Sequence, residues 1–198
     1  MKKVTLDEIV GLERYAQLRP EFRRRIIALK KDRRVAVGDR ITFVFENHDT
    51  MLFQIQEMLH TEHIVDVDKI RDEIDVYNAL IPDAGELSAT MLIEITETGR
   101  IRDELVALIG IDEAVRLEIG DPAAGGFTVG AQFEGGRSKE DKLSAVQYVR
   151  FALDAAARRA FIAGTEPVQL IIDHPRYRHR AAITGAVRQS LARDLEAP

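Results

Sequence analysis

The sequence predicts an α+β protein in which N-terminal helices pack on a largely antiparallel sheet. Apolar residues recur at helical spacing in residues 1–82, strand-like apolar runs fill residues 87–184, and a last helix is expected over 185–196. The 198 residues, with 45% hydrophobic and 31% charged side chains, are ordinary for one compact unit. Residues 1–198 are therefore expected to form a single domain.

Cap and turn residues define the elements of the first part. Thr5 with Glu8 forms a capping box that predicts a helix over about 6–18, and Pro20 opens a second helix. Asp66 caps a later helix that ends before Pro82. The elements expected between them are strands over 34–37 and 41–45 and the longest helix, around 49–63.

The second part combines strands with shorter helices. The expected strands run over residues 87–96, 114–119, 127–133, 145–151, 168–173 and 176–183. The expected helices run over residues 99–109, 154–164 and 185–195. Strands that are grouped after a run of helices favour an antiparallel sheet.

Composition excludes several classes of function. Without cysteine the chain cannot form disulfides, perform thiol catalysis or bind an iron–sulfur cluster through cysteine, so a divalent metal would need His, Asp or Glu. The basic start of the chain meets Asp7, Glu8 and Glu13 before any apolar run forms. No secretion signal or membrane span is therefore expected, and the protein is expected to be cytoplasmic.

Charge is spread unevenly along the chain. The net charge is +6 over residues 1–34, −13 over 35–118 and +2 over 119–198. The basic and acidic parts are expected to attract each other, within the chain or across a homodimer. An acidic protein with one basic helix is a poor nucleic-acid binder, because its acidic part repels phosphate.

The strongest candidate site lies on the longest helix. Glu57, His60 and His63 recur three residues apart, so one carboxylate and two imidazoles share a helical face. This is the ligand set of a two-histidine, one-carboxylate site for a divalent metal, which Glu46 or His48 could complete. The angle between Glu57 and His63 strains chelation by all three. A polar helix–sheet junction and a metal-free pocket for an anion or small molecule are the alternatives.

A second candidate site follows the strand over 168–173. Arginine forks bind carboxylate or phosphate, so this cluster suits an anionic ligand. A solvated edge strand is the alternative, because alternation puts the arginines on one side of an extended chain. The members of the cluster are Asp173, His174, Arg176, Arg178 and Arg180.

Five blocks of sequence resemble a family of bacterial proteins of about this length whose function is unknown. The blocks are RPEFRRRIIALKK, FENHDTMLFQIQEML, GELSATMLIEI, GRSKEDKLSAVQYVRF and DHPRYRHRA. The resemblance spans nearly the whole chain and implies no established activity. Members of that family often lie beside genes for rubrerythrin-like and iron–sulfur proteins, which implies an accessory role near peroxide defence or electron transfer.

The resemblance also bears on the first candidate site. The family carries basic residues other than histidine at the positions of His48, His60 and His63, which implies that metal binding there is not a family property. The carboxylates and amides of the same region then become the better candidates for a shared polar pocket. They are Glu46, Asn47, Gln54, Gln56 and Glu57.

The expected function is binding, with no reaction or cofactor assigned. The leading hypothesis is a homodimeric accessory protein that binds an anionic small molecule or a protein partner. The alternative hypothesis is a metal-dependent enzyme with Glu57, His60 and His63 as metal ligands. The candidate ligand-binding residues are Glu46, Asn47, Gln56, Glu57, His60, Asp173, His174, Arg176 and Arg178.

Overall fold

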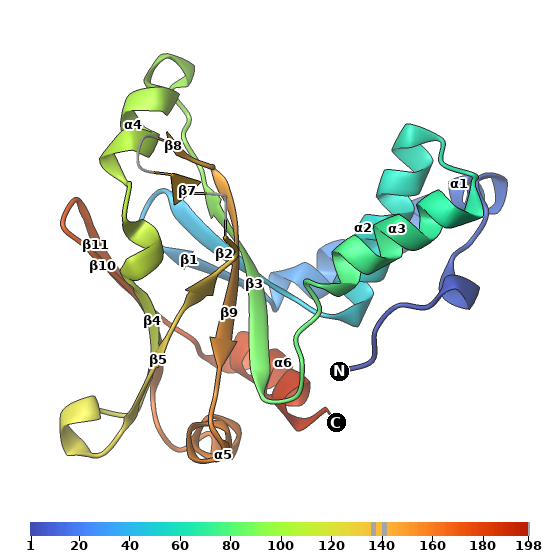
Figure 1. The fold of residues 1–198 in the computed structure, drawn as a ribbon. Helices are drawn as coiled ribbons and strands as arrows, with labels where there is room; N and C mark the ends of the chain where they lie inside the picture. Colours follow the sequence, from blue (N-terminus) through green and yellow to red (C-terminus); the bar gives the residue numbers. More distant parts are fainter. Residues whose placement is uncertain (136–137, 140–141, 198) are drawn as a thin grey trace.

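The structure, a computed structural model, describes residues 1–135, 138–139 and 142–197. Two antiparallel β-sheets face each other, with helices at both ends of the pair and a separate layer of helices beside it (Figure 1). The predicted α+β class and antiparallel sheet are confirmed. No helix in the described part of the chain is long and apolar enough to cross a membrane.

The larger sheet has five strands in the order β1-β2-β3-β9-β6. Their bounds are Arg34–Val37 (β1), Ile41–Glu46 (β2), Glu86–Ile93 (β3), Val146–Ala152 (β9) and Gln132–Phe133 (β6). The smaller sheet has the order β11-β10-β4-β5, with bounds Tyr177–Ala182 (β11), Val168–His174 (β10), Val115–Ile119 (β4) and Phe127–Gly130 (β5). A short hairpin adds β7 (Ser138–Lys139) and β8 (Lys142–Leu143).

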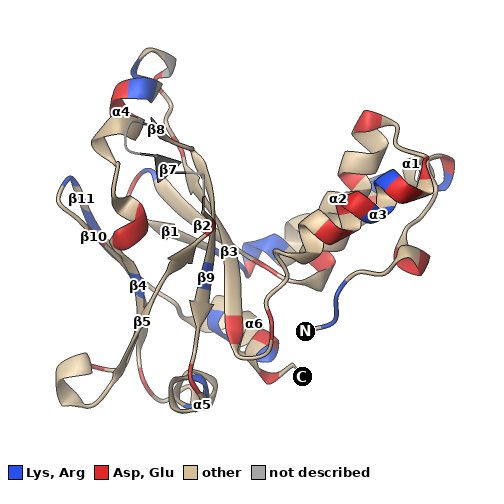
Figure 2. Cartoon of the chain, viewed as in Figure 1, with Lys and Arg blue, Asp and Glu red and all other residues tan. Residues whose placement is uncertain are grey.

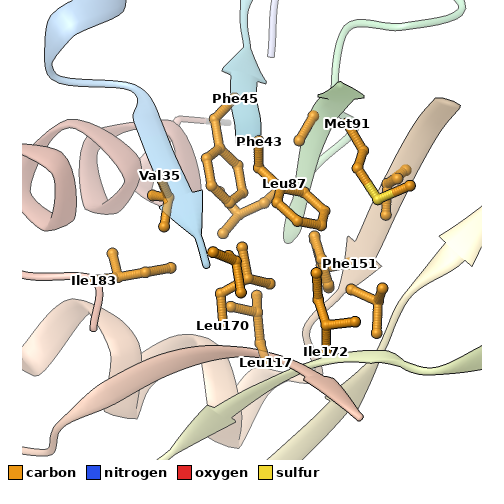
Figure 3. Close-up of a cluster of buried hydrophobic side chains, with 14 of the residues drawn as sticks. Val35, Phe43, Phe45, Leu87, Met91, Leu117, Phe151, Leu170, Ile172 and Ile183 are labelled. Atoms are coloured by element: carbon orange, nitrogen blue, oxygen red, sulfur yellow. The ribbon is translucent and has the colours of Figure 1, made fainter. Parts of the chain in front are cut away.

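The main core lies between the two sheets (Figure 3). Phe43, Phe45 and Met91 of the larger sheet are fully buried, as are Leu170 and Ile172 of the smaller one. Side chains alternate across a strand, so the residues between these point outward. Helices cover the ends of the core in Figure 1: α4 (Ile101–Ala107) at the top, and α5 (Ala155–Ala163) and α6 (Gly185–Glu196) at the bottom.

Three helices form a layer beside the larger sheet, at the right of Figure 1. They are α1 (Leu12–Lys31), α2 (His48–Glu62) and α3 (Val67–Asn78). A second apolar cluster joins α2 and α3 to the N-terminal segment, and Tyr148 of β9 packs against it. The buried members of this cluster are Val4, Met51, Ile55, Leu59, Ile74, Leu80 and Ile81. The helical layer therefore rests on the outward face of the larger sheet.

The prediction of two separate N-terminal helices is wrong. The capping box of Thr5 and Glu8 is present, but it closes only a 3₁₀ turn, η1 (Leu6–Glu8), and α1 continues through Pro20. A proline inside a helix costs about 3 kcal/mol, because it removes a hydrogen bond and crowds the preceding turn. Buried Tyr15 and Ile26 lie on either side of the proline and on the same face of α1, so packing offsets that cost.

Most other elements agree with the predicted ranges. Asp66 caps α3, Asp154 caps α5, and β11 returns antiparallel to β10. The strand expected over 127–133 is divided at Ala131, because β5 pairs with β4 whereas β6 pairs with β9 in the other sheet. The helix expected over 99–109 is reduced to α4 with a 3₁₀ turn on each side.

Charges of opposite sign meet between the basic start and the acidic middle of the chain (Figure 2). Arg19 Nε lies 2.7 Å from Glu57 Oε1, and Arg34 lies 2.7 Å from Glu94 Oε1. The expected attraction therefore operates within the chain.

Candidate functional site

A cavity of about 240 Å³ lies between the helical layer and the larger sheet. Outward-facing residues of β2, β3 and β9 form its floor, and side chains of α1, α2 and the end of α3 form its walls. The strand register places Val44, Thr90 and Tyr148 in one row across this floor. The polar lining groups are Lys30, Glu46, Gln54, Tyr77, Thr90 and Tyr148.

Glu46 is the last residue of β2 and is only 4% exposed. Its Oε1 accepts a hydrogen bond of 2.7 Å from the Thr90 hydroxyl group. Its Oε2 is buried and has no hydrogen-bond partner among the described residues. A buried polar atom without a partner costs about 1–3 kcal/mol, and more when it is charged. A hydrogen-bond donor that reaches this oxygen would remove this cost.

Two tyrosines and one lysine complete the polar part of the cavity. Burial raises the pKa of Tyr77, whose hydroxyl group is hydrogen-bonded to Gln54, so this tyrosine stays neutral at physiological pH. Tyr148 lies on the sheet side of the same cavity. Lys30 is half-buried, and its ammonium group has no ion-pair partner in the described part of the chain. The cavity therefore contains both a carboxylate and an ammonium group.

The predicted amides Asn47 and Gln56 have structural contacts. Asn47 caps α2, because its side-chain oxygen accepts a 3.0 Å hydrogen bond from the Thr50 N–H group. Gln56 is fully buried and binds the backbone of Val10 in both directions: its oxygen accepts from Val10 N at 2.6 Å and its nitrogen donates to Val10 O at 3.1 Å. Asn47 thus stabilises the start of α2, Gln56 joins α2 to the segment before α1, and neither amide lines the cavity.

The predicted metal ligands do not converge. Both Glu57 oxygens are bound by Arg19, at 2.7 and 2.8 Å, and Tyr15 donates a further hydrogen bond of 2.7 Å. The His60 ring packs edge-on against Tyr15, with centroids 5.7 Å apart. His63 is exposed, ends α2 in a left-handed conformation, and contacts the His60 carbonyl at 2.8 Å. The described residues include no group of three His, Asp or Glu side chains suited to a metal ion.

The C-terminal cluster divides into one buried and several exposed residues. His174 is 6% exposed, and its Nδ1 accepts from the Arg176 N–H group at 3.2 Å while its Nε2 donates to the Ile109 carbonyl at 3.1 Å. These contacts make His174 part of the hairpin structure. Asp173, Arg176 and Arg178 are exposed in and beside the turn of the hairpin.

A family model described as "Protein of unknown function (DUF3501)" matches residues 3–195. The chain belongs to this family. A crystal structure described as a novel protein of unknown function from Burkholderia pseudomallei K96243 is 37% identical, with a TM-score of 0.90, and the match covers 98% of this chain and 100% of that one. No curated protein matches the chain. The family resemblance is confirmed, and these descriptions name no activity, metal or link to peroxide defence.

Four of the five blocks that carry the resemblance to the DUF3501 family meet at the cavity. They supply Lys30, Glu46, Thr90 and Tyr148, with Gln54 from the same block as Glu46. Of these, Lys30, Thr90 and Tyr148 are not recognisable as site residues from local pattern, because an outward-facing strand residue or a late helix lysine is ordinary. Their occurrence in blocks that carry the same family resemblance as the block of Glu46 is the one sequence signal that groups them.

Proposed function

We propose that the protein binds a small zwitterionic molecule, of the size of a free amino acid, in the cavity between α2, α3 and the larger sheet. The observation that carries the proposal is the buried Oε2 of Glu46, which has no hydrogen-bond partner in the described part of the chain. An ammonium group of the ligand would give this oxygen a charge-assisted hydrogen bond, which is stronger than a neutral one. The proposed site is therefore complete only when a donor occupies it.

The remaining lining supports a ligand that carries both charges. Aromatic faces attract cations within about 6 Å, and Tyr77 and Tyr148 both line the cavity. Lys30 supplies a positive charge for a carboxylate, in keeping with the anionic group expected from the sequence. Pockets for drug-sized ligands have volumes of about 300–1,000 Å³. This cavity, with about 240 Å³, suits a smaller ligand.

Glu46→Gln tests the proposal by changing one atom of the side chain. With wild-type protein, one or more of the common amino acids is expected to raise the melting temperature saturably, whereas putrescine, which has no carboxylate, does not. Loss of a buried charged partner costs about 2–5 kcal/mol, so Glu46→Gln is expected to weaken binding by about 30-fold or more. Thermal shift followed by titration calorimetry measures both effects.

The free protein offers a second readout that needs no ligand. Glu46→Gln removes a buried, incompletely paired charge, so the unliganded variant is expected to be more stable than wild type by about 1 kcal/mol. Exposed Glu113→Gln is the matched control and should change neither binding nor stability. If Glu46→Gln is markedly destabilised, or binds the amino acid as wild type does, Glu46 is not the ligand's partner.

A further inference from the structure

The fifth block of the family resemblance lies far from the cavity, on the β10–β11 hairpin. Arg178 and Arg180 of β11 lie on the outward face of the smaller sheet, together with Arg116 of β4. Strand register places Arg180, Ile171 and Arg116 in one row across this face. Arg178 and Asp173 are paired on the same face, next to the turn of the hairpin. Figure 2 shows blue segments along the hairpin and on β4. Arg116 and Arg180 are far apart in the sequence and become neighbours because their strands both pair with β10.

These side chains surround a hollow of about 410 Å³. Asp173 lies between two of the arginines: its Oδ1 is 3.3 Å from Arg178 Nε and its Oδ2 is 3.6 Å from Arg116 NH1. Glu118 holds the other side of Arg116, with Oε1 at 2.8 Å from Nε. Two carboxylates therefore orient two guanidinium groups over the sheet and leave further N–H groups of each free to donate.

Arg180 differs from its neighbours because it has no ion-pair partner within the described ranges. Three arginines and two carboxylates leave a net charge of +1 on this face, and exposed Arg176 in the adjoining turn adds another positive charge. Uncompensated positive charge in a hollow raises the local concentration of anions. A guanidinium group also binds the two oxygens of one oxyanion as a fork, which a lysine cannot do.

We propose that this face is an oxyanion site in which Arg180 and Arg178 bind a phosphate or carboxylate group of a small molecule, with Arg116 as the third donor. The site lies on the other sheet and does not depend on the Glu46 cavity. Asp173 and Glu118 act as positioning residues, because their ion pairs fix the guanidinium planes of Arg178 and Arg116. Phosphate and carboxylate share this chemistry, so the choice between them is made by titration.

The experiment titrates inorganic phosphate and glutarate at constant ionic strength, with binding followed by calorimetry and by NMR shifts of β11 amides. Wild type is expected to bind one of these anions saturably, and the tighter one identifies the ligand group. Arg180→Ala and Arg178→Ala are each expected to weaken binding by about tenfold, the effect of losing one charge-assisted fork. Arg159→Ala, which removes an exposed arginine of α5 away from this face, is the matched control.

Arg180→Lys separates a fork from simple charge attraction. It keeps the charge but loses the planar donor pair, so the proposal expects binding several-fold weaker than wild type. Equal binding by wild type and Arg180→Lys, equal weakening by Arg159→Ala and Arg180→Ala, or absence of saturation with either anion would each overturn the proposal. Circular dichroism confirms that the variants fold, which is expected because these side chains are exposed.

Discussion

The Glu57 carboxylate binds α1 to α2 through Tyr15 and both arms of Arg19. The hydrogen bonds from Arg19 hold its pKa below the ordinary value of 4.5, against partial burial, which raises the pKa. A depressed pKa in the folded state means that ionised Glu57 stabilises the fold above pH 4.5. That contribution disappears as the pH falls through the lower folded-state pKa. Glu57, a candidate metal ligand in the sequence, is thus a residue that joins α2 to α1.

Glu57→Gln is expected to lower the free energy of unfolding at pH 7 by about 1–2 kcal/mol, a modest loss because Arg19 is partly exposed and solvent screens the pair. The difference from wild type is expected to shrink as the pH falls below 4.5 toward the lower folded-state pKa, because protonation of wild-type Glu57 then removes the same charge. Urea denaturation at pH 7 and pH 3 measures it. Exposed Glu62→Gln on the same helix is the control. A difference independent of pH would mean that the charge of Glu57 is not what matters.

At the scale of elements, the turn after β1 joins the two sheets. Tyr177 of β11 donates its hydroxyl hydrogen to the Val37 carbonyl at 2.8 Å and accepts from the Arg40 N–H group at 3.0 Å. Gly38 lies directly beneath it with φ of 75°, in the left-handed region that favours glycine. A Cβ atom there would lie 2.4 Å from the Tyr177 hydroxyl oxygen and 2.7 Å from the ring of His179. The absence of a side chain is what lets β11 approach β1.

Gly38→Ala is therefore expected to destabilise the protein by at least about 2 kcal/mol, from left-handed strain and overpacking together. Thermal and urea denaturation measure the loss. Gly130→Ala provides the comparison, because nothing lies within 4 Å of a Cβ at that position and its φ is not positive. Similar stabilities of the two variants would show that the β11 contact is not tight in solution.

At the scale of the whole molecule, a buried ion pair joins the helical layer, the larger sheet and the C-terminal helix. Arg33 is 1% exposed, donates to the Phe45 carbonyl at 2.7 Å and to Ser190 at 3.1 Å, and forms an ion pair with Asp194 of α6. Burial raises the pKa of the Asp194 carboxyl group even though Arg33 opposes this. The two charges are far apart in sequence and depend on each other in the fold.

Arg33→Met is expected to lower the free energy of unfolding by about 3–5 kcal/mol, because it leaves Asp194 buried without its cation. The double variant Arg33→Met/Asp194→Leu is expected to lose less than the sum of the two single variants, since neither charge then remains unpaired. Urea denaturation of the four proteins gives this coupling directly. Additive losses would contradict the proposed dependence of one charge on the other.

Elements whose signals are local could be predicted from the sequence. Capping by Asp66 and Asp154, the alternation in 145–151 and the last helix from Gly185 all depend on residues within one or two turns of each other. The exclusion of cysteine chemistry also requires no structure, since it depends only on composition. The helix break predicted at Pro20 is wrong because the cost of the proline is local, whereas the packing that offsets this cost involves residues distant in the sequence.

Which polar residues meet depends on how the strands pair and how the helices pack. Glu46 and Glu57 look equivalent in sequence, yet Glu57 is bound by Arg19 and Tyr15, whereas one oxygen of Glu46 has no partner among the residues that the structure describes. Lys30, Tyr77 and Tyr148 join Glu46, and Arg116 joins Arg180, only through strand pairing and helix packing across long sequence separations. The physical reason is that burial and hydrogen-bond satisfaction are properties of neighbours in space, and periodicity along the chain predicts only which face a residue occupies.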